Sequence, residues 1–328
     1  MPQQRHLFII DPLASLRWDL DTSLGLARAL LSLGHEVWIS ECSKLSWLSG
    51  TPCVQAQVER LEFNGTEPRT RGKPELLSCA EFHAVHMRKD PPFDLAYITC
   101  TWLLDSLHGQ SRVFNLPASL RTINEKLGIF LVPEHAHPTL VSANADELLS
   151  FIEGTCQGDA IIKPFDSFGG RGVERVNLRE LGKEATLKRL KEQTAEGHTL
   201  RFVQRFSSEI FSGEVRAFAV GGKPLAWCLK LPAEGSYLAN TRAGAQLSSY
   251  RPSSALEADI TSIAGRLWRD YGIAFVGFDL IAGKLSEINV TSPRLLQGHD
   301  DTNDYFLPMA QWVSRQCRQL LSSKTRNS

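Results

Sequence analysis

The sequence predicts an α/β protein, because short apolar strands alternate with helices along most of the chain. Near the N-terminus, a strand over residues 6–10, a helix beginning after 21–23 and a strand over 36–39 form a βαβ unit. A second α/β segment follows, and strand-like runs dominate from Arg201 onward. We therefore expect three parts: an N-terminal domain over 1–123, a second subdomain over 124–200 and a third subdomain over 201–328.

The composition is that of a globular protein with balanced charge. Apolar residues make up 42% of the 328 residues, enough to bury a core, and 36 basic side chains balance 36 acidic ones. Because no excess positive charge is available to grip a phosphate backbone, a nucleic-acid partner is not expected. No apolar stretch is long enough to span a bilayer, and the seven cysteines are scattered without a C-x-x-C pair. We expect a cytoplasmic protein with no membrane partner.

Local signals place the elements of the first domain. Residues 21–23 offer N-caps to a helix that Gly34 ends. Residues 49–77 are polar and rich in turn formers, which predicts an irregular region or an insertion. A strand is expected over 82–87 and a helix around 102–104. No G-x-G-x-x-G turn accompanies the first strand, which disfavours a dinucleotide-binding site.

Further elements are predicted in the second and third parts. We expect a helix over 146–153 and a last helix whose apolar stripe is core packing. Strands are expected over 160–163, 202–204, 215–220 and 226–231.

The segment over 275–293 carries the strongest chemical signal. Two apolar strands flank residues 282–284, and a three-residue loop there puts Asp279 opposite Glu287, with Asn289 on the same face. Two carboxylates and an amide oxygen make a hard-oxygen site suited to Mg²⁺. The alternative is an exposed strand face with ordinary polar residues. Against it, both strands look central, and facing carboxylates repel unless a cation lies between them.

A second signal is the glycine-rich stretch after a strand that ends at Lys163. Gly169 and Gly170 would let backbone N–H groups approach a phosphate, and the lysine would add a positive charge. The stretch is not a Walker A loop, and a glycine-rich turn is often only a hairpin. Lys126 and Arg216 are further basic candidates, although such charges are commonly just solvated.

Residues 202–206 form a strand whose backbone could contact an adenine edge. By residue type alone, this strand is indistinguishable from any buried strand.

Together, several motifs resemble prokaryotic glutathione synthetase, a family with the ATP-grasp fold. The resemblance runs through nearly the whole chain in the same order and is most specific in MRKDPPFD and in the last hairpin. The matching motifs are IIDPLASL, MRKDPPFD, NLPASLRTINEKLG, IIKPFDSFGG and GIAFVGFDLIAGKLSEINVTSP. The resemblance implies an N-terminal βαβ domain, a lid subdomain and a C-terminal antiparallel-sheet subdomain.

The resemblance also implies roles for individual residues. Catalytic roles fall to Arg216 and Lys163, and magnesium or manganese would be held by Asp279, Glu287 and Asn289. ATP would be bound by Lys126, Lys163, Gly169, Gly170, Gln204, Arg205 and Phe206. Substrate-side candidates are Arg88, Asp90, Asn240, Arg242 and Ser292.

The implied reaction is the ATP-dependent joining of a carboxylate to an amine through an acyl phosphate. γ-Glutamylcysteine and glycine are the default substrates and glutathione the default product. Phosphoryl transfer needs charge neutralisation more than a protein nucleophile, which suits lysines, an arginine and a metal ion. Relatives of this kind commonly form symmetric homo-oligomers.

Two regions depart from the family pattern, and both lie on the substrate side. The usual loop R-I-P-x-x-G-E-x-R-G-N-x-x-x-G-G-R is KLPAEGSYLANTRAGAQ over 230–246, and the usual I-R-E after T-S-P is replaced by RLLQGHDD. The lysine that usually precedes Arg216 is Val215. Two alternatives follow: the same chemistry on a different amino acid or thiol peptide, or an ATP-binding scaffold or sensor whose ligase activity has decayed. Costly buried charges argue against decay.

Overall fold

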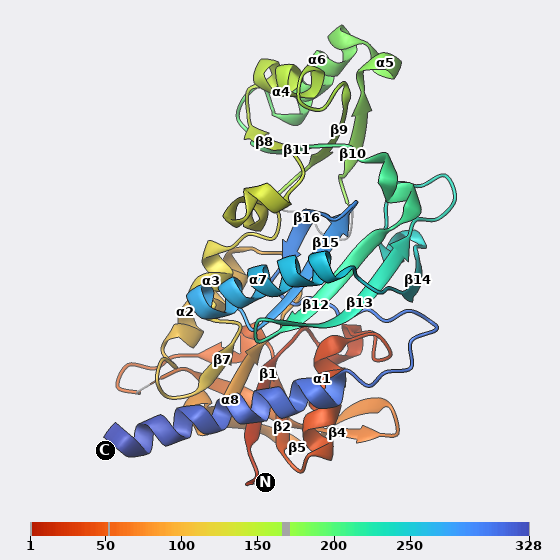
Figure 1. Cartoon of the computed structure of the whole chain (residues 1–328). Helices are drawn as coiled ribbons and strands as arrows, with labels where there is room; N and C mark the ends of the chain where they lie inside the picture. The colour runs from red at the N-terminus through yellow and green to blue at the C-terminus, as the bar shows by residue number, and fades with distance from the viewer. Residues whose placement is uncertain (1, 52, 166–170, 328) are drawn as a thin grey trace.

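The structure is a computed structural model that describes residues 2–51, 53–165 and 171–327. Its strands form three sheets stacked along the long axis of the molecule, and both termini lie at the lower end in Figure 1. Within the described residues, no helix is long and apolar enough to cross a membrane.

The lower sheet contains the N-terminal strands. They are β1 (Arg5–Ile9), β2 (Glu36–Ser40), β3 (Leu45–Ser46), β4 (Gln55–Asn64), β5 (Glu67–Ser78), β6 (Ala84–Met87) and β7 (Arg112–Phe114). The accompanying helices are α1 (Thr22–Ser32), α2 (Leu95–Asp105), α3 (Pro117–Thr122) and α8 (Phe306–Asn327). The predicted βαβ unit is confirmed, since β1 pairs in parallel with β2, and the Asp21 side chain caps α1 by accepting from Leu24 N at 2.9 Å. Helix α8 packs along α1, so the end of the chain returns to the first sheet (Figure 1).

The expectation of an irregular region over 49–77 is wrong. Most of these residues form β4 and β5, a long antiparallel hairpin that turns at Gly65. Ala56, Val58 and Leu61 on β4 are buried, whereas β5 is an almost fully exposed edge strand. An exposed edge strand needs no apolar face. The sequence of β5 is therefore as polar as that of a loop, although its backbone is paired with β4.

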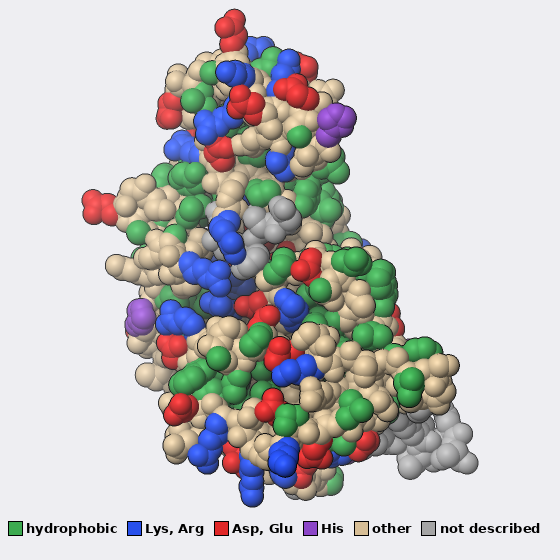
Figure 2. Space-filling view, turned by 180° about the vertical axis from the view of Figure 1, so that it is seen from behind, with side chains coloured by type: hydrophobic (Ala, Val, Ile, Leu, Met, Phe, Trp, Pro, Cys, Tyr) green, Lys and Arg blue, Asp and Glu red, His purple; other side chains and the backbone are tan. Residues whose placement is uncertain are grey.

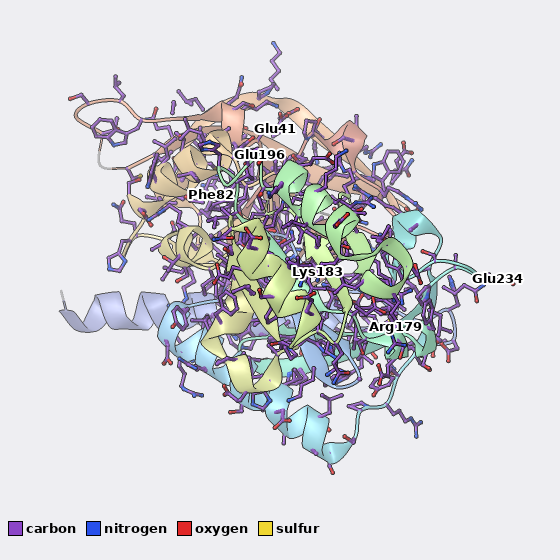
Figure 3. All side chains as sticks on the ribbon, turned by 90° about the horizontal axis from the view of Figure 1, so that it is seen from above. Glu41, Phe82, Arg179, Lys183, Glu196 and Glu234 are labelled. Carbon is purple, nitrogen blue, oxygen red and sulfur yellow. The ribbon has the colours of Figure 1, made fainter. Side chains whose placement is uncertain are left out.

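The upper sheet has the strand order β10-β9-β11-β8. Its strands are β8 (Thr139–Ser142), β9 (Asp159–Lys163), β10 (Glu174–Asn177) and β11 (Arg201–Arg205), and its helices are α4 (Ala145–Glu153), α5 (Leu178–Leu181) and α6 (Lys183–Gln193). Because β11 pairs with both β9 and β8, we propose that the second subdomain extends past residue 200 to about residue 205. Seen from above, Lys183 on α6 lies near the middle of the molecule, whereas Glu234, in a loop of the chain outside this unit, lies at the outer edge (Figure 3).

The middle sheet is antiparallel and has the order β14-β13-β12-β15-β16. Its strands are β12 (Glu214–Val220), β13 (Lys223–Leu231), β14 (Gln246–Ser249), β15 (Phe275–Ile281) and β16 (Lys284–Asn289), and the long helix α7 (Ser254–Tyr271) lies across it (Figure 1).

One buried amide joins the lower and middle units. The Asn115 side chain donates to the backbone oxygens of Phe275 and Val290, both at 2.8 Å, and accepts from the backbone N–H of Ala274 and Phe275 at 2.7 and 2.8 Å. Every hydrogen-bonding atom of this amide that faces the middle sheet is therefore paired. This side chain fixes where β15 and β16 sit relative to the N-terminal domain.

A cluster of buried histidines in the first sheet links stability to pH. His6 Nδ1 and His86 Nε2 are 3.3 Å apart, while His6 Nε2 and His86 Nδ1 are buried and have no hydrogen-bond partner among the described residues. Burial and the neighbouring His86 lower the pKa of His6 well below its usual value, and burial followed by the charge of Arg88 lowers the pKa of His86 to about 3. Both rings are neutral in the folded protein near pH 7.

We predict that the free energy of unfolding falls as the pH is lowered from about 6.5, where unfolded histidine begins to take up protons that the folded chain excludes. Each such histidine contributes up to about 1.4 kcal/mol per pH unit. Urea unfolding of wild type and His86→Phe at pH 7.5, 6.5 and 5.5 should show a shallower pH dependence in the variant. The exposed His108 provides the control His108→Gln, which should keep the wild-type slope. Equal slopes for wild type and His86→Phe would contradict the prediction.

Candidate active site

A concentration of charged side chains lines a cavity between the upper and middle sheets. The cavity holds about 930 Å³ of space that opens to solvent. From behind, Lys and Arg side chains gather around a hollow at this height (Figure 2). The lining residues that carry charge or a polar group include Lys163, Gln204, Arg205, Glu214, Arg216, Lys230, Asn240, Asp279, Ser286, Glu287 and Asn289.

The β15–β16 hairpin places the predicted metal ligands side by side. Asp279 lies directly opposite Glu287, and Asn289 lies opposite Gly277, as the sequence predicted. The loop is shorter than predicted, because Ile281 pairs with Lys284 across the two residues between them. The register shifts by one residue after Asp279, and this irregularity restores the predicted pairing. Without the shift, Glu287 would face the opposite side of the sheet.

Asp279 is surrounded by positive charge. Arg216 is its partner on β12, with Nε 3.0 Å from Asp279 Oδ1, and Lys230 Nζ on β13 donates to the same oxygen at 2.6 Å. Asn289 Nδ2 donates to Oδ2 at 2.9 Å. Burial alone would raise the pKa of Asp279, but the charges of Arg216 and Lys230 and the hydrogen bonds from Lys230 and Asn289 lower it to about 2. The carboxylate is ionised at every physiological pH.

Glu214 extends this network on the same face of β12 as Arg216. Its carboxylate contacts Lys230 Nζ and accepts a hydrogen bond from Ser286 Oγ at 3.2 Å. Burial raises the pKa of Glu214. For Lys230, burial lowers the pKa, but the negative charges of Asp279 and Glu214 outweigh this effect, and the pKa of Lys230 is raised. Glu214 was not predicted as a site residue, although its two-residue spacing from Arg216 on a strand indicates that both face the same side.

Glu287 is paired more loosely. Its Oε1 lies 3.6 Å from Nζ of Lys163, which also donates to Gln204 Oε1 at 3.3 Å. Lys163 and Gln204 come from the upper sheet and Glu287 from the middle sheet, so these contacts span the cavity. The three predicted metal ligands, Asp279, Glu287 and Asn289, would all offer oxygen atoms. The amide nitrogen of Asn289 donates to Asp279, which leaves its amide oxygen for a cation. Within the described residues, no group of three or more His, Cys, Asp or Glu side chains is placed to hold a metal. A Mg²⁺ ion fits here as an ion that takes one or two carboxylates and completes its ligands with phosphate oxygens and water.

Comparisons with known proteins relate nearly the whole chain to one family. The pattern of the prokaryotic glutathione synthetase N-terminal domain matches residues 5–121, and that of the ATP-grasp domain of the same family matches residues 125–303. A glutathione synthetase of Ralstonia nicotianae is 36% identical over 301 residues, covering 89% of each chain, and one of Parasynechococcus marenigrum is 36% identical over 290 residues, covering 88% of this chain and 91% of that protein. The chain belongs to the prokaryotic glutathione synthetase family.

Solved structures with low sequence identity share the fold. D-cycloserine synthetase DcsG superposes with a TM-score of 0.65 at 16% identity, covering 95% of this chain and 99% of that one. ATP-grasp ligase PsnB, complexed with a minimal precursor, gives 0.62 at 14% identity, covering 96% and 98%. The ATP-grasp fold is thereby confirmed, and the family consists of ADP-forming ligases that use ATP and Mg²⁺.

The predicted adenine strand borders the same cavity. Gln204, Arg205 and Phe206 all line it, with Gln204 buried and Arg205 exposed. Lys126 is buried at the start of a short 3-10 helix over Leu127–Leu131, and it is not among the residues that line the cavity in the described part of the chain. Gly169 and Gly170 lie outside the described residues.

A second cavity adjoins the first through Arg216, Lys230, Asn240 and Asn289. It contains four of the five predicted substrate-side residues: Asp90, Asn240, Arg242 and Ser292. Glu125 also lines this cavity and was not predicted; its Oε1 accepts from Thr291 N at 3.3 Å and from Thr291 Oγ1 at 2.6 Å. Nothing in its local sequence distinguishes it, because the contact joins residues far apart in the chain.

Arg88, the fifth candidate, has a different place. It is buried, its Nε donates to Ser23 Oγ at 3.1 Å, and its Nη2 donates to Pro293 O at 2.9 Å. It is not among the residues that line either cavity in the described part of the chain. Arg88 thus braces the segment that follows β16 against the N-terminal domain.

The departures from the family pattern also have structural consequences. Lys230 keeps a cation beside Asp279. Asn240 accepts from Ala243 N at 2.7 Å and so shapes the loop after β13. In the altered segment after β16, Asp300 accepts from Ser249 N at 2.8 Å and from Ser249 Oγ at 2.5 Å. The Gly298-His299-Asp300 run therefore ties β14 to this segment.

Gly277 controls the position of Arg216. A Cβ at Gly277 would lie 2.3 Å from Arg216 Nη1, so only glycine leaves room for the guanidinium above β15. We predict that Gly277→Ala displaces this flexible side chain and lowers kcat by about 100-fold, because small misplacements of a reacting group have effects of that size. The thermal midpoint should fall only modestly, because Lys230 still pairs with the buried Asp279 carboxylate when Arg216 is displaced.

A matched control is Gly265→Ala on α7, where the added Cβ would lie 3.0 Å from Nη1 of Arg269, outside the cavity. It should retain wild-type turnover. Steady-state ADP release by both variants checks this, and a wild-type kcat in Gly277→Ala would rule out the role given to Arg216.

Proposed function

We propose that the chain joins the carboxylate of γ-glutamylcysteine to the amine of glycine and converts ATP to ADP and phosphate. The observation that carries this proposal is the facing pair Asp279 and Glu287, which lies with Asn289 in a cavity bordered by Lys163 and Arg216. Such an arrangement supplies an oxygen-ligand metal site beside cations that can bind phosphate. The family membership of the chain supports the same chemistry.

Each residue would act by holding charge in place. Asp279, Glu287 and Asn289 would hold Mg²⁺, which offsets negative charge on the phosphates when it is bound. Lys163 reaches across the cavity from β9 and would hold the γ-phosphate, while Arg216 would face the acyl phosphate as its charge develops.

Lys230 contacts the same oxygen of Asp279 as Arg216 does. Its presence keeps the buried charges nearly balanced when neither metal nor nucleotide is there.

The nucleotide would lie between the upper and middle sheets. We assign the adenine edge to the backbone of residues 204–206, where Phe206 packs with Ile210 and Ala239. Lys126, Gly169 and Gly170 stay predictions as phosphate-binding residues. A lid role for the upper unit agrees with its small, separate core.

The acceptor and peptide would occupy the second cavity. Asp90, Asn240, Arg242 and Ser292 line it next to Arg216, which gives the reacting carboxylate a route to the γ-phosphate. Lys230 in place of arginine, and the altered loop over 230–246, support a second candidate function: the same ligation with another amino acid or thiol peptide. Arginine and lysine differ in carboxylate recognition because only arginine can bind it bidentately.

A cytoplasmic location is proposed together with this function. All seven cysteines are free thiols and six of them are buried, which suits a reducing compartment. A homo-oligomeric state stays a prediction.

The direct test is ADP release by the purified protein with Mg²⁺-ATP, γ-glutamylcysteine and glycine, omitting each in turn. We expect turnover only with all components and a product with the mass of glutathione. Turnover with another amine or carboxylate in place of one substrate would support the second candidate. ADP release that ignores both substrates, or nucleotide binding without turnover across a panel of amino acids and peptides, would contradict a ligase.

The metal assignment has its own test in Glu287→Gln. This change removes the charge of a half-buried carboxylate whose ion pair with Lys163 is long, so the fold should tolerate it. We expect ADP release to fall at least about 100-fold, because a metal-bridged phosphate loses one of its anchors. Turnover should recover in part at raised Mg²⁺ concentration.

The exposed Glu192 on α6 provides the control Glu192→Gln, which should behave as wild type. Asp279→Asn is a less specific variant, because it would also leave Arg216 buried without its anion and Lys230 with Glu214 alone. Wild-type turnover and an unchanged Mg²⁺ requirement in Glu287→Gln would show that this carboxylate holds no metal.

A further inference from the structure

Asp90 and Arg294 stand where two cavities meet. One is the second cavity, which reaches Arg216 and Lys230. The other extends from Asp90 and Arg294 toward the N-terminal sheet, where it reaches Asp11. The two side chains therefore line both cavities.

The backbone on both sides of Arg294 is anchored. Arg88 Nη2 donates to Pro293 O at 2.9 Å, and Leu295 N donates to Thr22 Oγ1 at 2.8 Å. Both contacts are buried and tie this segment to the N-terminal domain. Arg294 is thus presented from a fixed stretch of chain.

Asp90 is anchored in a similar way. Its backbone N–H donates to Asp11 Oδ2 at 2.8 Å, and Asp11 Oδ1 in turn lies 3.5 Å from Lys89 Nζ. The side chain of Asp90 lines both cavities and has a hydrogen bond with the Ser292 side chain. The two charged groups come from different units, yet both start from rigid backbone.

The pair between them is loose. Arg294 Nη2 lies 3.9 Å from Asp90 Oδ2, beyond hydrogen-bond distance, and each side chain is 33% exposed. An ion pair of this kind contributes little to stability, and both groups keep donors and acceptors for a ligand. A fixed cation and a fixed anion that face one cavity complement a group carrying both charges, such as the ammonium and carboxylate of an α-amino acid.

We propose that Asp90 and Arg294 bind the free α-amino acid head of the carboxylate substrate, Asp90 its ammonium and Arg294 its carboxylate. This inference rests on the proposed ligase function and deepens it. The head belongs to the carboxylate substrate because an ammonium held by Asp90 is not free to act as the nucleophile. The site thus selects peptides whose first residue is linked through its side chain, as in a γ-glutamyl peptide, over simple carboxylic acids.

Arg294 is also a residue at which this chain departs from the family pattern after T-S-P. The inference makes it a specificity-determining residue of this chain.

Three donors separate the two contacts: γ-glutamylcysteine, glutarylcysteine, which lacks the ammonium, and 4-aminobutyrylcysteine, which lacks the α-carboxylate. We expect Arg294→Gln to raise KM for γ-glutamylcysteine about 10- to 100-fold, the size of a lost charge-assisted contact, and to leave KM for 4-aminobutyrylcysteine unchanged. Asp90→Asn should raise KM for γ-glutamylcysteine and leave KM for glutarylcysteine unchanged. In both variants, kcat and KM for ATP should stay near wild type.

Arg251→Gln is the control, since Arg251 is exposed and lines neither of these cavities. If wild type makes the peptide from γ-glutamylcysteine but the variants raise KM equally for all three donors, or for none, the inference fails while the proposed function stands. If wild type instead ligates only donors without the amino acid head, both the proposed substrate and the inference fail.

Discussion

The active site depends on a charge that is kept away from water, the carboxylate of Asp279. An isolated ion in such a place would be strongly destabilising, and the chain offsets this with Arg216 from one neighbouring strand and Lys230 from the next. These partners must be ionised for the site to be stable, and they are also the groups that a phosphate or acyl phosphate attracts. The fold therefore holds these cations in place for phosphoryl transfer while their charges stay paired. Stability and chemistry share the same side chains.

This network depends on the pairing of β12 with β15 and on a register shift between β15 and β16. The shift after Asp279 turns Glu287 toward the cavity, and Gly277 leaves the space that the Arg216 guanidinium fills. Asn115 then fixes β15 and β16 to the N-terminal domain through four hydrogen bonds. The predicted metal ligands on β15 and β16 are thus held in place against the first sheet, whereas the upper unit has its own core and reaches the cavity through Lys163 and Gln204.

Local patterns predicted most of the fold and the centre of the site. Residues 275–293 combine apolar strands with polar groups at a spacing of two, so the pairing of Asp279 with Glu287 could be predicted even though the loop was assigned one residue too many. The hairpin over β4 and β5 could not, because an exposed edge strand carries no apolar alternation. Glu125 could not be found either, and Arg88 could not be separated from the substrate residues, since contacts with Thr291, Ser23 and Pro293 join positions 65 or more residues apart.

The same structure explains why the nucleotide side and the substrate side of this chain differ from the family to different degrees. Around Asp279, a substituted residue must still neutralise the buried carboxylate. Lys230, which stands where the family has arginine, does so because it is also a cation. Around Asp90 and Arg294 the charges are partly solvated, and a substitution there costs little stability while it changes which ligand groups are paired. The altered run at residues 298–300 keeps a structural contact, because Asp300 ties it to Ser249 on the edge strand of the middle sheet. Desolvation therefore constrains the chemistry, and solvent exposure leaves the specificity free to change.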